Sequence, residues 1–328
     1  MAIREEGPNA IELRNVYLLK ITTTHFVVLV KVIEKSDLYL KAVVDGVTPP
    51  LVNSLRRVLI SDVPVLAIDE VIILDNTSVL YDEVLAHRLS MIPIKTDLKK
   101  LPKIEECEQE LVDPSLCQVR FELNVEAKEP MVVYSRDLKS DDPEVRPVYE
   151  DIPIVKLVPG QKIVLEAYAK LGRARNHAKW QAGLASYYYY PKVSVVGKAD
   201  DKCRVCLEVC NGALEIRDDG SIVINDVLKC TFNKWKTCEQ VCPALKVDWD
   251  ENKYVFWVES FGNMPVEDMV REGFRILKGK FQEFVNELEL ELSRGQAPSG
   301  ELAAGGAAEE SAEVTGEEFG TEEGPGEE

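Results

Sequence analysis

The sequence has no long apolar run. No stretch approaches the roughly 20 apolar residues that a membrane-spanning helix needs. Charged residues stand within Met1 to Ala10, where a signal peptide has its apolar core. We therefore expect a cytoplasmic protein without membrane contact. At 328 residues and 45% hydrophobic content, the chain can bury a large core, and two or three domains are expected.

Motifs for catalysis and nucleotide binding are also missing. Neither Gly-x4-Gly-Lys-[Ser/Thr] nor Gly-x-Gly-x-x-Gly occurs, so no phosphate-binding loop is indicated. The three histidines, His25, His87 and His177, stand in no Ser/His/Asp or Cys/His arrangement and are expected to be core or surface residues. We predict that this chain has no catalytic site.

Basic residues are outnumbered by acidic ones, 39 to 57. The net charge is −18, and residues 295–328 hold ten Glu and no Lys or Arg. The rest of the chain is still acidic, which argues against DNA or RNA as the main ligand, because clustered Lys and Arg bind polyanions. The tail, residues 294–328, is rich in Gly, Ala, Glu and Pro, and we expect it to be disordered. A functional acidic tail is the alternative.

Strand and helix patterns are mixed along the rest of the chain, which predicts an α+β fold. Residues 27–44 form two β-branched runs around a charged turn, which indicates a hairpin. Pro49-Pro50 begins a predicted helix that ends before Pro64. Further predictions are strands at 65–74, 116–127, 162–169 and 254–258 and a short helix at 81–89.

Two predicted helices have apolar faces. The first carries Leu51, Leu55, Val58 and Leu59 on one side. The second begins at Pro265 and could run for about 27 residues. Its apolar side chains recur at heptad spacing: Val270, Phe274, Leu277, Phe281, Phe284 and Leu288. They can pack on their own domain or on a partner helix, and the length of the helix favours a partner.

Six of the eight cysteines lie between Lys198 and Asp250: Cys203, Cys206, Cys210, Cys230, Cys238 and Cys242. They form Cys-x2-Cys-x3-Cys, then Cys230, then Cys-x3-Cys-Pro. This arrangement resembles the duplicated run of two-cluster bacterial ferredoxins, in which the fourth Cys of each run ligates the other run's cluster. Similar strand-like segments, residues 213–216 and 244–247, follow the two runs, which supports an internal duplication.

Each run lacks one ligand of the ferredoxin pattern, and Trp235 stands where the second run would have a Cys. Crossing the runs as ferredoxins do implies two trios. Our first choice for a cluster site is Cys210, Cys230 and Cys238, and the second group is Cys203, Cys206 and Cys242. Three thiolates suit an iron–sulfur cluster, with [3Fe–4S] favoured over a [4Fe–4S] cluster that takes a non-cysteine fourth ligand.

Other uses of these cysteines stay open. Zinc is the main alternative, since Cys-x2-Cys followed by two more Cys is also a zinc spacing. One group can instead be a disulfide or free thiols, although a disulfide-only framework is unusual in a reducing cytosol outside hyperthermophiles. Cys107 and Cys117 stand apart, and we interpret them as structural.

Several segments resemble the α-like subunit family of RNA polymerases. Residues 51–64 contain Asn-x-Leu-Arg-Arg-x-Leu, the pattern of the helix at that family's dimer interface. The match continues through residues 67–71, 76–83 and 85–93 and resumes at 174–180. These motifs are similar to those of the archaeal D subunits and of the related eukaryotic subunit. Several motifs in order over roughly residues 29–292 are more specific than any single one.

The resemblance implies a division of the chain. The dimerisation domain would be split between residues 29–62 and 251–293, around an α+β insert domain at 63–197 and a ferredoxin-like iron–sulfur module at 198–250. Residues 1–28 would be an N-terminal extension and residues 294–328 the acidic tail. A cysteine-rich insert is also a feature of many archaeal D subunits.

The implied function is non-catalytic. The chain would pair with the small α-like subunit L and form the platform for the large catalytic subunits of the polymerase. Its interface would include Leu51, Leu55, Arg56, Arg57 and Leu59 together with the heptad residues of the second helix. The two arginines can contact carboxylates of neighbouring subunits or be a solvated pair. The alternative is an iron–sulfur electron-transfer protein, which would copurify with a reductase or oxidase.

Overall fold

The computed structural model describes residues 16–19 and 28–294, with side chains for 28–293. The chain divides into two compact units, residues 1–282 and 283–328. Most of the predicted N-terminal extension, residues 1–28, lies outside the described residues. His25 and residues 295–328 of the predicted tail lie outside them as well. None of the helices in the described ranges is long and apolar enough to cross a membrane.

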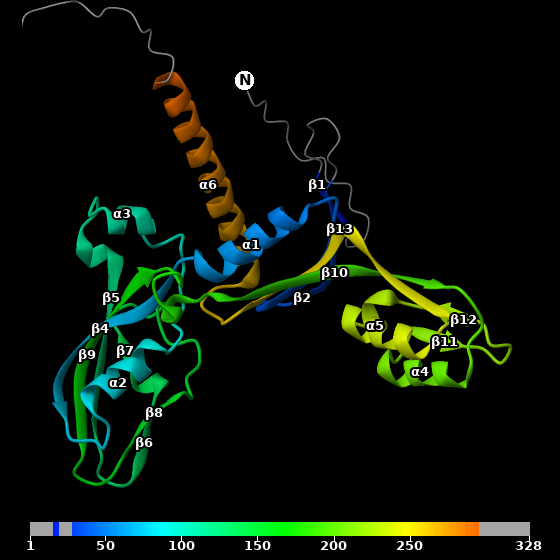
Figure 1. Ribbon diagram of the computed structural model, residues 1–328. Helices are drawn as coiled ribbons and strands as arrows, with labels where there is room; N and C mark the ends of the chain where they lie inside the picture. Colours follow the sequence, from blue (N-terminus) through cyan, green and yellow to red (C-terminus); the bar gives the residue numbers. More distant parts are fainter. Residues whose placement is uncertain (1–15, 20–27, 295–328) are drawn as a thin grey trace, which may run out of the picture. The chain divides into compact units, whose positions relative to one another are not determined.

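A five-stranded antiparallel sheet in the first unit has the order β1-β2-β3-β13-β10 (Figure 1). Its strands are β1 (Val16–Leu19), β2 (Val28–Lys35), β3 (Tyr39–Asp45), β10 (Gly183–Val195) and β13 (Leu245–Ser260). The predicted hairpin is confirmed as β2 and β3, with Ser36 N bonded to Tyr39 O across the turn. Strands from both ends of the sequence thus lie side by side in one sheet.

Two helices pack against this sheet. Helix α1 (Pro49–Ser61) begins with the two prolines and buries Val52, Val58 and Leu59. Helix α6 (Val266–Arg294) is 29 residues long, so both helix predictions are confirmed. Their apolar side chains join the sheet in one core, which includes Tyr254, Phe256 and Val258 of β13.

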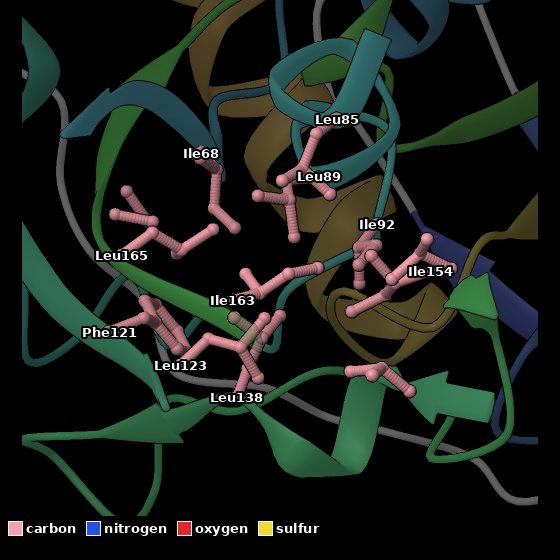
Figure 2. Close-up of a cluster of buried hydrophobic side chains, with 14 of the residues drawn as sticks. Ile68, Leu85, Leu89, Ile92, Phe121, Leu123, Leu138, Ile154, Ile163 and Leu165 are labelled. Carbon is pink, nitrogen blue, oxygen red and sulfur yellow. The ribbon is translucent and has the colours of Figure 1, made fainter. Parts of the chain in front are cut away.

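A second antiparallel sheet has the order β4-β9-β5-β7. It consists of β4 (Val65–Asn76), β5 (Gln118–Glu126), β7 (Lys139–Ser140) and β9 (Lys162–Gly172). Helix α2 (Asp82–Ser90) contributes Leu85 and Leu89 to its core, where they lie among Ile68, Phe121 and Ile163 (Figure 2). These elements confirm the strands and the short helix expected in this region.

Smaller elements complete this part of the chain. Strands β6 (Met131–Tyr134) and β8 (Pro153–Leu157) form a two-stranded sheet. Helix α3 (Ile104–Glu108) and the 3-10 turns η1 (Pro114–Cys117), η2 (Ser135–Asp137) and η3 (Ala178–Trp180) lie in the connections. The mixed, antiparallel architecture agrees with the predicted α+β class.

The cysteine-rich segment connects the C-terminal end of β10 to the N-terminal end of β13. After a register shift between Tyr189 and Pro191, these two strands stay paired as far as Val195 and Leu245 (Figure 1). The segment adds η4 (Asp201–Arg204), α4 (Val205–Val209), β11 (Leu214–Ile216), β12 (Ile222–Ile224), η5 (Val227–Lys229) and α5 (Phe232–Val241). The strand-like runs after each cysteine group are confirmed as β11 and the start of β13.

Candidate functional site

All six cysteines of the segment are buried in one cluster. Cys203 lies in η4, Cys206 in α4 and Cys210 directly after α4, while Cys230 follows η5. Cys238 lies in α5, and Cys242 is its C-cap residue. The sequence therefore places the cysteines on two short helices and on the 3-10 turns before them, around a common apolar core.

The cysteine contacts lie both within the two predicted trios and between them. In the first trio, Cys210 and Cys230 form a disulfide, and Cys238 Sγ lies 3.6 Å from Cys210 Sγ. In the second, Cys203 and Cys242 form a disulfide, but the Cys206 thiol donates instead to the backbone oxygen of Cys238, at 3.7 Å. Cys206 and Cys238 are the two free thiols.

Burial controls the chemistry of the two thiols. Burial raises the pKa of Cys206. Burial, and secondly the interaction with Cys206, raises the pKa of Cys238 to about 12. Both are therefore protonated near neutral pH, whereas thiolates are the nucleophiles and metal ligands. No three His, Cys, Asp or Glu side chains in the described ranges are arranged to hold a metal ion.

The donor set can nevertheless suit a cluster once the Cys210–Cys230 disulfide is reduced. The first trio then supplies three soft thiols from three different backbone segments, in a core from which water is excluded. Trp235 is fully buried nearby and donates its indole N–H to Val227 O at 2.9 Å. It fills the core with an apolar ring, so the position that the ferredoxin pattern gives to a Cys offers no ligand.

Side-chain hydrogen bonds hold α5, which carries Cys238 and is capped by Cys242, against β13. Glu239 Oε1 accepts a hydrogen bond from Val247 N at 2.9 Å, and Lys236 Nζ donates to Val247 O at 2.6 Å. Lys236 also bonds Glu239 at 2.8 Å. These bonds tie α5 to β13, and sequence spacing did not reveal them.

The predicted face of α1 divides between core and surface. Leu51 is exposed, Leu55 is partly buried, and Leu59 has no exposed surface. Leu59 therefore belongs to the core of this chain. Arg56 is half-buried and donates through Nε to Asn53 Oδ1 at 3.1 Å, while Arg57 is exposed.

The heptad residues of α6 also divide. Val270 packs against the core and Leu277 is only 8% exposed. The other four are far more exposed: Phe274 53%, Phe281 55%, Phe284 62% and Leu288 48%. Val285 and Leu292, which the heptad count omitted, are exposed as well. Their spacing from Phe281 and Leu288, four residues in each case, was the available signal.

The remaining sequence candidates in the described residues lie outside the cysteine cluster. Cys107 and Cys117 form a disulfide that closes the segment between α3 and η1. His177 accepts a hydrogen bond from Lys179 N and caps η3, and His87 is exposed on α2. Neither histidine lies in a cluster of metal-binding side chains within the described residues.

A family model described as the RNA polymerase Rpb3/RpoA insert domain matches residues 70–185. Curated relatives match most of the chain and carry the name DNA-directed RNA polymerase subunit Rpo3. That of Pyrobaculum neutrophilum is 60% identical over 260 residues, which are 79% of this chain and 94% of the relative. That of Pyrobaculum calidifontis is 57% identical over 260 residues (79% and 96%). That of Pyrococcus horikoshii is 39% identical over 263 residues (79% and 97%).

Proposed function

Because the chain belongs to the Rpo3 family of archaeal DNA-directed RNA polymerase subunits, we propose that it pairs with the small α-like subunit L. It is a non-catalytic assembly subunit of that enzyme. The heterodimer would be the platform on which the large catalytic subunits assemble, in the cytoplasm. Nucleic acid would be held by other subunits, since the chain is acidic.

The observation that carries this proposal is the set of large apolar side chains exposed along α6. Phe281, Phe284 and Leu288 lie on one side of the helix and are each about half exposed or more. Contiguous exposed apolar surface marks interaction sites, and aromatic side chains dominate binding energy when a partner covers them. Leu51 and Arg57 of α1 are exposed as well and are further candidates for contact with a partner.

Tagged purification of the full chain from its own cells tests the proposal. A polymerase subunit should retain a small α-like protein and the large subunits through size exclusion. Recovery of the chain with a reductase or oxidase, and without polymerase subunits, would contradict it and favour the electron-transfer alternative.

We also propose that Cys210, Cys230 and Cys238 hold an iron–sulfur cluster, [3Fe–4S] rather than [4Fe–4S]. The proximity of Cys238 Sγ to Cys210 Sγ supports this assignment. Loading requires that a thiol reductant first deliver two electrons to the Cys210–Cys230 disulfide, which yields two thiols. The Cys203–Cys242 disulfide can stay intact, which gives the second group a structural role.

Anaerobic, reduced protein should contain iron and acid-labile sulfide and should absorb in the visible range. Cys238→Ser should abolish this absorbance, while Cys206→Ser, a change of the other buried thiol, should leave it. Stoichiometric zinc without sulfide would contradict the cluster and support the zinc alternative.

A further inference from the structure

The last three turns of α6 carry a narrow apolar stripe. Phe284, Val285, Leu288 and Leu292 are all exposed. At 3.6 residues per turn, their Cα positions fall within an arc of about 100°. This width suits a single partner helix that packs along the stripe.

Acidic side chains border this stripe on both sides. By the same helical geometry, Glu287 and Glu291 lie along one border and Glu289 along the other. All three are exposed, and Arg294 is the only basic residue within 281–294. Glu283 lies on the opposite side of the helix and is also exposed.

Two copies of this helix make poor partners for one another. Because both borders are acidic, parallel and antiparallel packing of two identical stripes each bring glutamates opposite glutamates. Charges beside the apolar seam of a helix pair determine partner choice, and like charges oppose pairing. A helix with Lys or Arg at its borders would instead gain an attraction at every contact.

We infer that Glu287 and Glu289, one on each border, select a partner helix whose apolar stripe is bordered by Lys or Arg, and that they oppose self-pairing of this chain. The inference rests on the proposed function, which supplies a partner for α6. It adds the chemistry of that partner and a reason for a heterodimer rather than a homodimer.

The affinity for the partner and the affinity of the chain for itself should respond to salt in opposite directions. Salt screens attraction and repulsion alike, so NaCl should weaken binding of the partner and strengthen self-association. The full chain alone should be a monomer at about 0.05 M NaCl and self-associate more at about 0.5 M NaCl. A tight homodimer at the lower salt concentration would overturn the inference.

The binding experiment uses the full chain and the small α-like subunit of the same polymerase as the probe. Glu287→Lys combined with Glu289→Lys should weaken binding about tenfold at low salt and reverse its salt dependence. Glu283→Lys, a single charge reversal on the opposite side of α6, should alter affinity by less than about twofold. Circular dichroism should show the same helix content in all three proteins.

The outcomes separate this inference from the proposed function. If the double variant binds as tightly as the wild type, with the same salt dependence, the selection by glutamates is wrong while the pairing stands. If the wild type fails to bind the small subunit at every salt concentration, the pairing itself is wrong, and the inference falls with it.

Discussion

Asp62, the C-cap residue of α1, forms an ion pair of 2.5 Å with Lys280 of α6. The Asp62 side chain is only 7% exposed, and its other cationic neighbour, Arg175, lies 4.0 Å away. The pair joins residues 218 positions apart in sequence. It therefore joins the middle of the long helix to the C-terminal end of the short one.

Lys280→Met should destabilise the chain, because it leaves the buried Asp62 carboxylate with Arg175 as its remaining cationic neighbour. We expect the free energy of unfolding to fall by about 1–3 kcal/mol, measured by urea denaturation. Lys278→Met is the matched control, since Lys278 is exposed on the same helix. Equal stability of the two variants would show that the ion pair contributes little.

The two helices also meet at Gly273. A Cβ atom there would lie 2.6 Å from Leu59 Cδ2 and 3.2 Å from Leu59 Cγ. Gly273→Ala should therefore cost about 1–3 kcal/mol of unfolding free energy through overpacking. Thermal unfolding provides the measurement.

Gly279→Ala is the control within the same helix, because its Cβ would meet nothing within 4 Å. There the alanine should stabilise the chain by about 0.5–1 kcal/mol through helix propensity. Destabilisation of similar size in both variants would show that close packing at Gly273 is not the cause.

Cysteine reactivity should distinguish the disulfide-bonded protein from the cluster-loaded one. The disulfide-bonded chain should expose two alkylatable thiols in denaturant, Cys206 and Cys238, and all eight after reduction. After acid release of a cluster under anaerobic conditions, Cys210 and Cys230 should also react. Mass spectrometry gives the count directly, and two thiols from iron-containing protein would contradict the proposed ligands.

Glu267 connects the start of α6 to β2. Its pKa is lowered from the usual 4.5 to about 2, by the hydrogen bond from Arg271 first and that from Lys35 second. A depressed carboxyl pKa gives stability that is present above pH 4.5 and is lost as the pH falls through about 2. NMR titration of the carboxyl carbon checks the value.

Glu267→Gln should remove the part of the loss of folding stability at low pH that comes from protonation of this carboxylate. The stability difference between variant and wild type should then shrink as the pH falls from 4.5 toward 2. A difference that stays constant over that interval would show that the Glu267 carboxylate makes no pH-dependent contribution.

Local sequence signals predicted much of this fold. Pro49-Pro50 and the spacing of Leu51, Leu55 and Leu59 predicted α1. Cysteine spacing grouped Cys210 with Cys230 and Cys238, and this grouping stays a prediction. These features depend on residues that are close in sequence or that recur at a regular spacing. The prediction that the chain is not catalytic rested on missing sequence motifs and required no knowledge of the fold.

Long-range relationships could not be predicted in this way. The Asp62–Lys280 pair and the approach of Gly273 to Leu59 depend on how α1 and α6 pack. Strand β13 begins at Leu245, inside the segment assigned to the cysteine module, because its pairing with β10 continues beyond the register shift. Helical periodicity also could not tell that Leu59 and Leu277 face their own core while Phe284 does not.

The most direct test of pairing through α6 is the dissociation constant of the full chain for the small α-like subunit, compared between wild type, Phe284→Glu and Leu290→Glu. Both side chains are exposed on the same helix, but Leu290 lies on the side opposite the apolar stripe. A charge buried without a partner costs several kcal/mol, so Phe284→Glu should abolish measurable binding, while Leu290→Glu should bind like the wild type. Unchanged affinity of Phe284→Glu would contradict the account.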